Sequence, residues 1–263
     1  SGVDLAHVAD LWEENQEYLK QRLGSSTSTA FGARWVVMPE ASSPRFNHVS
    51  RIRLPPDEVD DLVETCRTYF LSQGLPIASL LVTPATQPAD LGARLYKLGF
   101  TSETNPVMVW NGTPVVPQAP HLRVEPAPPE QAGLVFELIR RVFFPNATHQ
   151  SLAMGRRGVE ISYEIEAVNF VAYWGSRPAG AGMLFCRGGM GGIYNMCTLP
   201  EFRGRGVATA VLAACIAEAQ RRGCTHVGLT PTAMGRPLYE RLGFREVYQE
   251  RYFVERFRDW GME

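Results

Sequence analysis

Two stretches of this chain repeat the same order of structural signals, and this repeat constrains the fold more than any other feature. Each stretch has a strand-like segment, a Leu-Pro pair, a helical segment that stops at a glycine, a second strand-like segment, a short helical segment and Leu-Gly-Phe. The matching positions are Leu54-Pro55, Gly74 and Leu98-Gly99-Phe100 in the first stretch, and Leu199-Pro200, Gly223 and Leu242-Gly243-Phe244 in the second. Alternating strands and helices predict an α/β fold, built twice along the chain.

Composition and charge exclude several classes of protein. The 263 residues suffice for one large domain or two modest ones, and 45% hydrophobic with 20% charged residues is ordinary for a soluble globular protein. A net charge of -1 does not give the basic surface of a nucleic-acid-binding protein, and no run of about 18 apolar residues predicts a membrane span. The five cysteines form no Cys-x-x-Cys pair, so neither a disulfide framework nor a metal site is expected. We expect a cytoplasmic protein with reduced thiols.

A proline-rich stretch marks the boundary expected between the two halves. Residues 111–120 hold three prolines and have no helical periodicity. We therefore expect a first domain over residues 1–112, a linker over 113–120 and a second domain over 121–263. Helices are expected at 4–23, 89–98, 128–143, 205–222 and 234–242, with another opening at Pro55–Glu58, and strands at 34–38, 47–54, 78–82, 121–124, 168–174, 180–186, 192–199, 226–230 and 244–255.

The segment from Leu199 to Thr209 carries the clearest sign of chemistry. It lies between a predicted strand and the start of a long predicted helix, where free N–H groups and the positive end of the helix dipole attract anions. Gly204 and Gly206 let the backbone approach an anion closely, and Arg203 and Arg205 add positive charge. These features together predict a phosphate-binding site.

These residues resemble the coenzyme A signature of the GNAT N-acetyltransferase superfamily. The signature, Arg/Gln-x-x-Gly-x-Gly/Ala, is matched by Arg203, Gly206 and Ala208. The resemblance continues through residues 234–244 and covers about 140 residues, from His121 to the end of the sequence. It implies two tandem GNAT-like α/β domains, each a mixed sheet flanked by helices, of which the second uses acetyl-CoA as its cosubstrate.

The resemblance also implies roles for particular residues. In the family, the pantetheine arm lies between two splayed strands and bonds to the backbone of the first. The strand positions carried over to this sequence are Met196, Cys197 and Thr198, and the pyrophosphate positions are Gly204, Arg205, Gly206, Val207, Ala208 and Thr209, after Arg203. Thr232 follows the next strand, where the family places a second coenzyme contact and more commonly has asparagine.

Tyr239 matches the family's tyrosine that faces the thioester sulfur. Amine attack on acetyl-CoA expels a thiolate, and a phenol can protonate that thiolate. The pKa of a free tyrosine, near 10, lies above that of a thiol, near 8.5, so full proton transfer is uphill by about 2 kcal/mol. The expected role of Tyr239 is therefore a catalytic hydrogen-bond donor that can complete the transfer.

The group that deprotonates the acceptor amine is not identified by the sequence. Some GNAT enzymes carry a glutamate on the strand before the second coenzyme contact, but the segment from His226 to Thr230 has no acid. Candidates in the variable segment before the central strands are His149, Glu160, Glu164 and Glu166. Glu160 and Glu164 are four residues apart and would share one face of a helix.

The first half lacks the residues of a phosphate site. From Leu54 to Gly74 the chain advances 20 residues, whereas from Leu199 to Gly223 it advances 24, and Pro56-Asp57-Glu58 stands where the glycines and arginines would be. Proline removes a donor and the two acids repel phosphate. Leu95 falls at the place of Tyr239, and Tyr96 is rotated from it by about 100° on a helix. We expect the first half to be a degenerate GNAT-like domain that binds no coenzyme and forms part of the wall of the acceptor pocket.

The expected activity is transfer of the acetyl group of acetyl-CoA to a primary amine, by direct attack, with a small-molecule acceptor. A protein or peptide N-terminus or lysine is the alternative acceptor. A non-catalytic acetyl-CoA-sensing module, or a structural adaptor that binds no coenzyme, are the alternatives to an enzyme. Because a tandem pair already mimics the dimer that some GNAT proteins form, a monomer is as compatible with the sequence as a homodimer.

Overall fold

The computed structural model describes residues 4–257, which form two compact units. The first unit takes in the chain up to Val107 and again from Val247, and the second unit is Met108–Glu246. The sequence predicts a division into 1–112 and 121–263 instead. The difference arises because two long strands, β4 (Thr101–Trp110) and β10 (Phe244–Arg256), each continue from one unit into the other.

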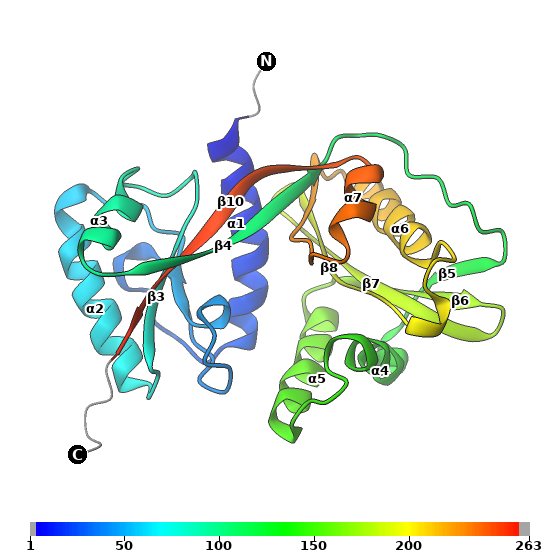
Figure 1. Cartoon of the computed structure of the whole chain (residues 1–263), viewed down its shortest axis with the longest axis horizontal. Coiled ribbons are helices and arrows are strands. Elements are labelled where there is room, and N and C mark those ends of the chain that lie inside the picture. Colours follow the sequence, from blue (N-terminus) through cyan, green and yellow to red (C-terminus); the bar gives the residue numbers. More distant parts are fainter. Residues whose placement is uncertain (1–3, 258–263) are drawn as a thin grey trace. The chain divides into compact units, whose positions relative to one another are not determined.

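The first unit is a mixed sheet with helices packed against it (Figure 1). Its strands lie in the order β1-β2-β3-β10-β4. Its other elements are α1 (Leu5–Leu23), β1 (Arg34–Val36), β2 (His48–Ser50), α2 (Val59–Ser72), β3 (Ile77–Val82) and α3 (Leu91–Lys97), with 3-10 turns at Ala30–Gly32, Pro44–Phe46 and Pro56–Glu58. The core under α2 and α3 is built around Trp35, Leu62, Phe70 and Phe253, all fully buried.

The second unit is a sheet in the order β4-β9-β8-β7-β6-β5, with α4 and α5 on one face and α6 on the other (Figure 1). Its elements are β5 (Leu122–Pro126), α4 (Ala132–Phe143), α5 (His149–Glu164), β6 (Val168–Trp174), β7 (Arg177–Arg187), β8 (Met190–Thr198), α6 (Val207–Arg221), β9 (His226–Leu229) and α7 (Arg236–Arg241), with 3-10 turns at Pro129–Gln131 and Pro200–Phe202. All strand pairs from β5 to β8 are antiparallel, and β8 and β9 are parallel.

The two halves of the chain exchange their final strands. In the first unit, β3 pairs antiparallel with the end of β10, from Ile77 opposite Arg256 to Val82 opposite Arg251. In the second unit, β9 pairs antiparallel with the end of β4, at Met108 opposite Leu229 and Val109 opposite Gly228. Each unit therefore contains a strand from the other half of the chain. A division at the proline-rich stretch does not predict this exchange.

The expected α/β fold with mixed sheets is confirmed, and each predicted helix and strand has a counterpart. Two elements were not predicted as such: β4 and α5. β2 is shorter than the expected 47–54 because Arg51 has φ 58, a left-handed conformation that ends the extended segment.

α6 lies close to the sheet because two of the strand positions beneath it are glycines. A Cβ atom on Gly180 of β7 would lie 2.5 Å from the carbonyl oxygen of Cys197 and 2.7 Å from Cγ1 of Val207. The apolar side of α6, including Val211, Leu212 and Cys215, is fully buried against this surface. α6 can therefore pack closely on β7 because Gly180 and Gly182 have no side chains there.

We predict that Gly180→Ala lowers the free energy of unfolding by about 1–3 kcal/mol, because the added methyl group overpacks the contact between β7 and α6. Urea denaturation followed by circular dichroism measures the change. Gly133→Ala is the control, since a Cβ at Gly133 in α4 meets nothing within 4 Å, and its effect should lie between none and a gain of about 1 kcal/mol. An unchanged midpoint in Gly180→Ala would contradict the close packing.

Candidate active site

Strands β8 and β9 run side by side for only three residues and then separate. Their parallel pairing covers Met190, Gly191 and Gly192, opposite 226–228. From Ile193 to Thr198, β8 keeps its antiparallel pairing with β7 on its other side, while β9 ends at Leu229. The edge of β8 that faces away from β7 therefore presents backbone groups to an opening in the sheet.

A bulge in β8 bends the strand at this opening. Ala181 is opposite Cys197 and Met183 is opposite Tyr194, so two residues of β8 face one residue of β7. One of the two, Asn195, has φ 57, a left-handed conformation that asparagine tolerates better than most residues. A bulge of this kind turns the following residues out of the regular sheet.

α6 begins beside the opening, at the segment predicted to bind phosphate. Gly204 has φ 75 and Gly206 has φ 81, values that favour glycine. Gly206 is the N-cap residue and contributes no side-chain acceptor, so no side chain caps the N–H groups of the first turn of α6. Such a turn, with its positive dipole end, is an anion site available to a ligand.

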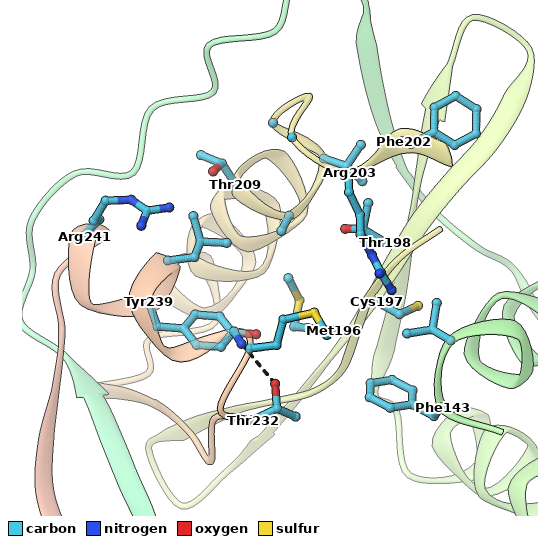
Figure 2. A pocket seen from close by; sticks show the side chains of 18 residues that line it. Phe143, Met196, Cys197, Thr198, Phe202, Arg203, Thr209, Thr232, Tyr239 and Arg241 are labelled. Atoms are coloured by element: carbon cyan, nitrogen blue, oxygen red, sulfur yellow. Dashed lines mark hydrogen bonds between the residues drawn. The ribbon is translucent and has the colours of Figure 1, made fainter. Parts of the chain in front are cut away.

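The opening and the start of α6 form one cleft of about 670 Å³ (Figure 2). Eleven of the twelve residues that the sequence analysis selected line this cleft: Met196, Cys197, Thr198, Arg203, Gly204, Gly206, Val207, Ala208, Thr209, Thr232 and Tyr239. Arg205 is the exception. Its guanidinium carbon lies 5.3 Å from the ring centre of Trp174 and 5.7 Å from that of Phe202, so the side chain lies over these two rings and does not itself line the cleft.

Tyr239 lies on α7 and is only 8% exposed. Its ring packs edge-on against Phe244, with ring centres 5.8 Å apart, and lies so close to Gly235 that a Cβ there would be 3.0 Å from Cε2. Burial raises the pKa of the Tyr239 hydroxyl to about 12, with smaller contributions from the thiols of Cys215 and Cys197. The phenol is therefore protonated at neutral pH, as a proton donor must be.

Thr232 lies at the entrance to α7. Its Oγ1 accepts a hydrogen bond of 3.1 Å from the backbone N–H of Gly235, drawn as the dashed line in Figure 2. This bond holds the turn that leads into the helix carrying Tyr239. The side chain of Thr232 thus has a structural role as well as a place on the cleft wall.

The four candidates for a general base do not line this cleft. His149, at the start of α5, is exposed, and Glu160 lines a separate groove between α4 and α5. Glu164 and Glu166 are exposed near the end of α5. The structure therefore does not bring any of these four together with Tyr239 in the cleft.

The structure adds lining residues that the sequence analysis did not select. They are Val142, Phe143, Phe202, Met234, Gly235, Leu238 and Arg241. Leu238 and Arg241 lie on α7 beside Tyr239, within the segment that resembles the family, so the sequence held a signal for them. Val142 and Phe143 come from the end of α4, and only tertiary packing brings them to the cleft.

Other kinds of site are not found in the part of the chain that the structure describes. Over residues 4–257, no three His, Cys, Asp or Glu side chains are grouped so that they could hold a metal ion. Among the described helices, none combines the length and apolar character needed to cross a membrane.

Comparison with known proteins agrees with this architecture. Residues 166–246, which span β6 to the start of β10, match the family model of the acetyltransferase (GNAT) domain. No curated protein sequence matches the chain significantly.

Solved structures resemble nearly the whole chain. A GCN5-related N-acetyltransferase from Kribbella flavida has a TM-score of 0.70 at 16% identity, covering 97% of this chain and 96% of its own. A functionally unknown conserved protein from Staphylococcus epidermidis ATCC 12228 has a TM-score of 0.64 at 13% identity, covering 89% and 95%. A GCN5-related N-acetyltransferase from Sphaerobacter thermophilus has a TM-score of 0.59 at 16% identity, covering 80% and 71%.

At these identities the structural likeness speaks for the fold, and it extends over both repeats of the chain. The family model independently covers the segment that holds the opening in the sheet, the start of α6 and Tyr239. Residues 166–246 thus match a GNAT acetyltransferase domain, and nearly the whole chain shares its fold with solved GCN5-related N-acetyltransferases.

Proposed function

We propose that the second unit binds acetyl-CoA in the cleft and transfers the acetyl group to a primary amine by direct attack. The observation that carries this proposal is the meeting of three features in one cleft: the exposed backbone edge of β8, the uncapped start of α6 and the buried hydroxyl of Tyr239. Acetyl-CoA, when bound, supplies the activated thioester.

The cleft offers fitting groups to each part of the coenzyme. Met196, Cys197 and Thr198 lie on the β8 edge and offer peptide groups to the amides of a pantetheine arm. The turn from Gly204 to Thr209 offers N–H groups to a pyrophosphate, and Arg203 adds a positive charge. Thr232, at the entrance to α7, fits a second contact. Because the Arg205 side chain stacks on Trp174, its expected contribution is reduced to its backbone N–H.

Tyr239 would stabilise the leaving sulfur by hydrogen bonding. With its pKa near 12 and that of the thiol near 8.5, complete transfer of the proton is uphill by about 5 kcal/mol. The hydroxyl therefore acts mainly as a donor to the developing thiolate, while the amine supplies the electron pair that forms the new bond to the acetyl carbon.

A small-molecule amine is the acceptor that we propose, and a protein or peptide N-terminus or lysine is the alternative. A non-catalytic acetyl-CoA sensor would need the start of α6 but not a proton donor. The placement of Tyr239 inside the same cleft favours catalysis over sensing.

The first unit, we infer, is a GNAT-like half that does not bind coenzyme. After β2 and β3 part, the chain closes again: the N–H of Gln87 donates to Ile52 O at 3.1 Å, and the N–H of Leu54 donates to Gln87 O at 3.0 Å. The fully buried carboxylate of Glu13 accepts hydrogen bonds from the Arg51 N–H at 2.6 Å and from the Thr83 hydroxyl at 2.9 Å. Backbone groups of Gln87 and the carboxylate of Glu13 thus bond to the separated segments, which leaves fewer of their groups available to a coenzyme.

We predict one acetyl-CoA site per chain, lost in Gly206→Glu, because a carboxylate at the start of α6 repels phosphate and a side chain at φ 81 strains the turn. Isothermal titration calorimetry measures stoichiometry and affinity. Gly223→Glu is the matched control: Gly223 follows the other end of the same helix, has φ 77 and would meet nothing within 4 Å. Two sites in the wild type would contradict the inference about the first unit, and no site would contradict the proposed function.

We predict that Tyr239→Phe lowers kcat about 100-fold, the usual size of a lost acid–base contribution, and leaves the Kd for acetyl-CoA unchanged. Thiol release with a panel of primary amines gives the rate, and calorimetry gives the affinity. Tyr163→Phe is the control, because the Tyr163 hydroxyl bonds to Ala127 O at 3.0 Å and does not line the cleft. Equal rates for Tyr239→Phe and the wild type would remove Tyr239 from the mechanism.

We predict that kcat/KM rises with pH as the acceptor amine loses its proton, and does not fall again up to about pH 10. The reason is that Tyr239 works in its protonated form, which is lost only as pH rises through its pKa of about 12. Rates with amines of different pKa, measured from pH 6 to 10, test this. A falling limb below pH 10 that disappears in Tyr239→Phe would contradict the raised pKa.

A further inference from the structure

The cleft contains a cation to which neither the sequence analysis nor the proposed mechanism gives a role. Arg241, the last residue of α7, lines the cleft on the α7 side and is exposed. Its guanidinium forms no hydrogen bond or ion pair with any residue in the range 4–257. An unpaired guanidinium on a cleft wall is free to bind an anionic group of a ligand.

Its neighbours differ from it in this respect. Arg236, at the start of α7, is paired with Glu240 at 2.6 Å and Glu246 at 2.9 Å, so both nearby carboxylates are already engaged. Arg245 donates to the backbone oxygens of Glu240 and Phe244, at 2.7 and 2.9 Å. Three arginines, Arg236, Arg241 and Arg245, border the same surface beside α7. Among the described residues, only Arg241 of these three has no hydrogen-bond or ion-pair partner.

Arg241 is placed at the part of the cleft where phosphate would lie. Figure 2 shows its side chain extending from α7 on the side of Thr209 and the first turn of α6, away from Cys197 and Phe143. The uncapped N–H groups of α6 and Arg203 already serve the pyrophosphate in the proposed complex. Arg241 therefore offers a separate positive charge on the opposite wall.

Coenzyme A carries one further anionic group, the monoester phosphate on the 3′-hydroxyl of its ribose. A phosphate monoester has a charge between −1.5 and −2 at pH 7, and the planar guanidinium fork of arginine matches phosphate oxygens with two parallel hydrogen bonds. We propose that Arg241 binds the 3′-phosphate and makes the protein select coenzyme A over its 3′-dephospho form. This inference rests on the proposed binding of acetyl-CoA in the cleft.

The test compares the affinities of coenzyme A and 3′-dephospho-coenzyme A by calorimetry. The wild type should bind coenzyme A about tenfold more tightly, the size expected for an exposed charge-assisted contact. In Arg241→Gln the two affinities should become equal, through loss of coenzyme A affinity alone, and Arg241→Lys should keep part of the preference because it keeps the charge. Arg157→Gln is the matched control, an exposed arginine of α5 that, among the described residues, also has no partner and does not line the cleft.

Equal affinities in the wild type would overturn the proposal, as would a loss in Arg241→Gln that is the same for both ligands. Failure of the wild type to bind either ligand would instead refute the proposed function. Unchanged circular dichroism and urea midpoints establish that Arg241→Gln is folded, as expected for an exposed residue at the end of α7.

Discussion

Strand β8 leaves its parallel neighbour β9 after Gly192, and the arrangement of the site follows from that departure. Inside a sheet, each backbone N–H and C=O has a partner on the next strand, and an unpaired buried group is costly. The edge of β8 avoids this cost because it borders a cleft, where water or a ligand supplies the missing partner. The bulge at Asn195 makes the departure possible while β8 keeps its pairing with β7. α6 then starts beside the opening, and α7 brings Tyr239 to it.

The first unit also has a residue in the left-handed conformation where two strands separate, but there the separated segments are bonded to other parts of the chain. Arg51, just past β2, has φ 58, close to the φ of 57 at Asn195 in β8. There Gln87 bonds back to the segment after β2, and the Glu13 carboxylate from α1 accepts hydrogen bonds from Arg51 and Thr83. Burial raises the pKa of the Glu13 carboxyl, against the opposing effect of Arg53 and Arg51, so a charge there is costly to bury. The hydrogen bonds that offset this cost hold α1 in register with the sheet.

The sequence predicts most accurately those features that depend on residues close together in the chain. The start of α6 was found because glycines, arginines and a helix onset occur within ten residues, and Tyr239 because it lies in a short segment that resembles a family. The sequence does not predict the strand exchange, because the residues of β4 and β10 do not indicate which strand each will pair with. Phe143 reaches the cleft through the packing of α4, which no local pattern encodes. The sequence predicts that Arg205 binds phosphate. In the structure its guanidinium lies over the Trp174 ring, where a cation–π interaction stabilises it.

The environment of Cys197 bears on the choice between direct attack and a covalent intermediate. This thiol lies on the same strand edge as the proposed pantetheine positions, where it could in principle accept the acetyl group before the amine does. Burial raises the pKa of the Cys197 thiol to about 12, and the thiolate is the form that attacks. At neutral pH the Cys197 thiol therefore stays protonated. In the proposed reaction, burial would therefore have two consequences: it would keep the hydroxyl of Tyr239 protonated as a donor, and it would keep Cys197 from competing with an amine. Both are arguments for the proposed direct attack on the thioester over a covalent intermediate on Cys197.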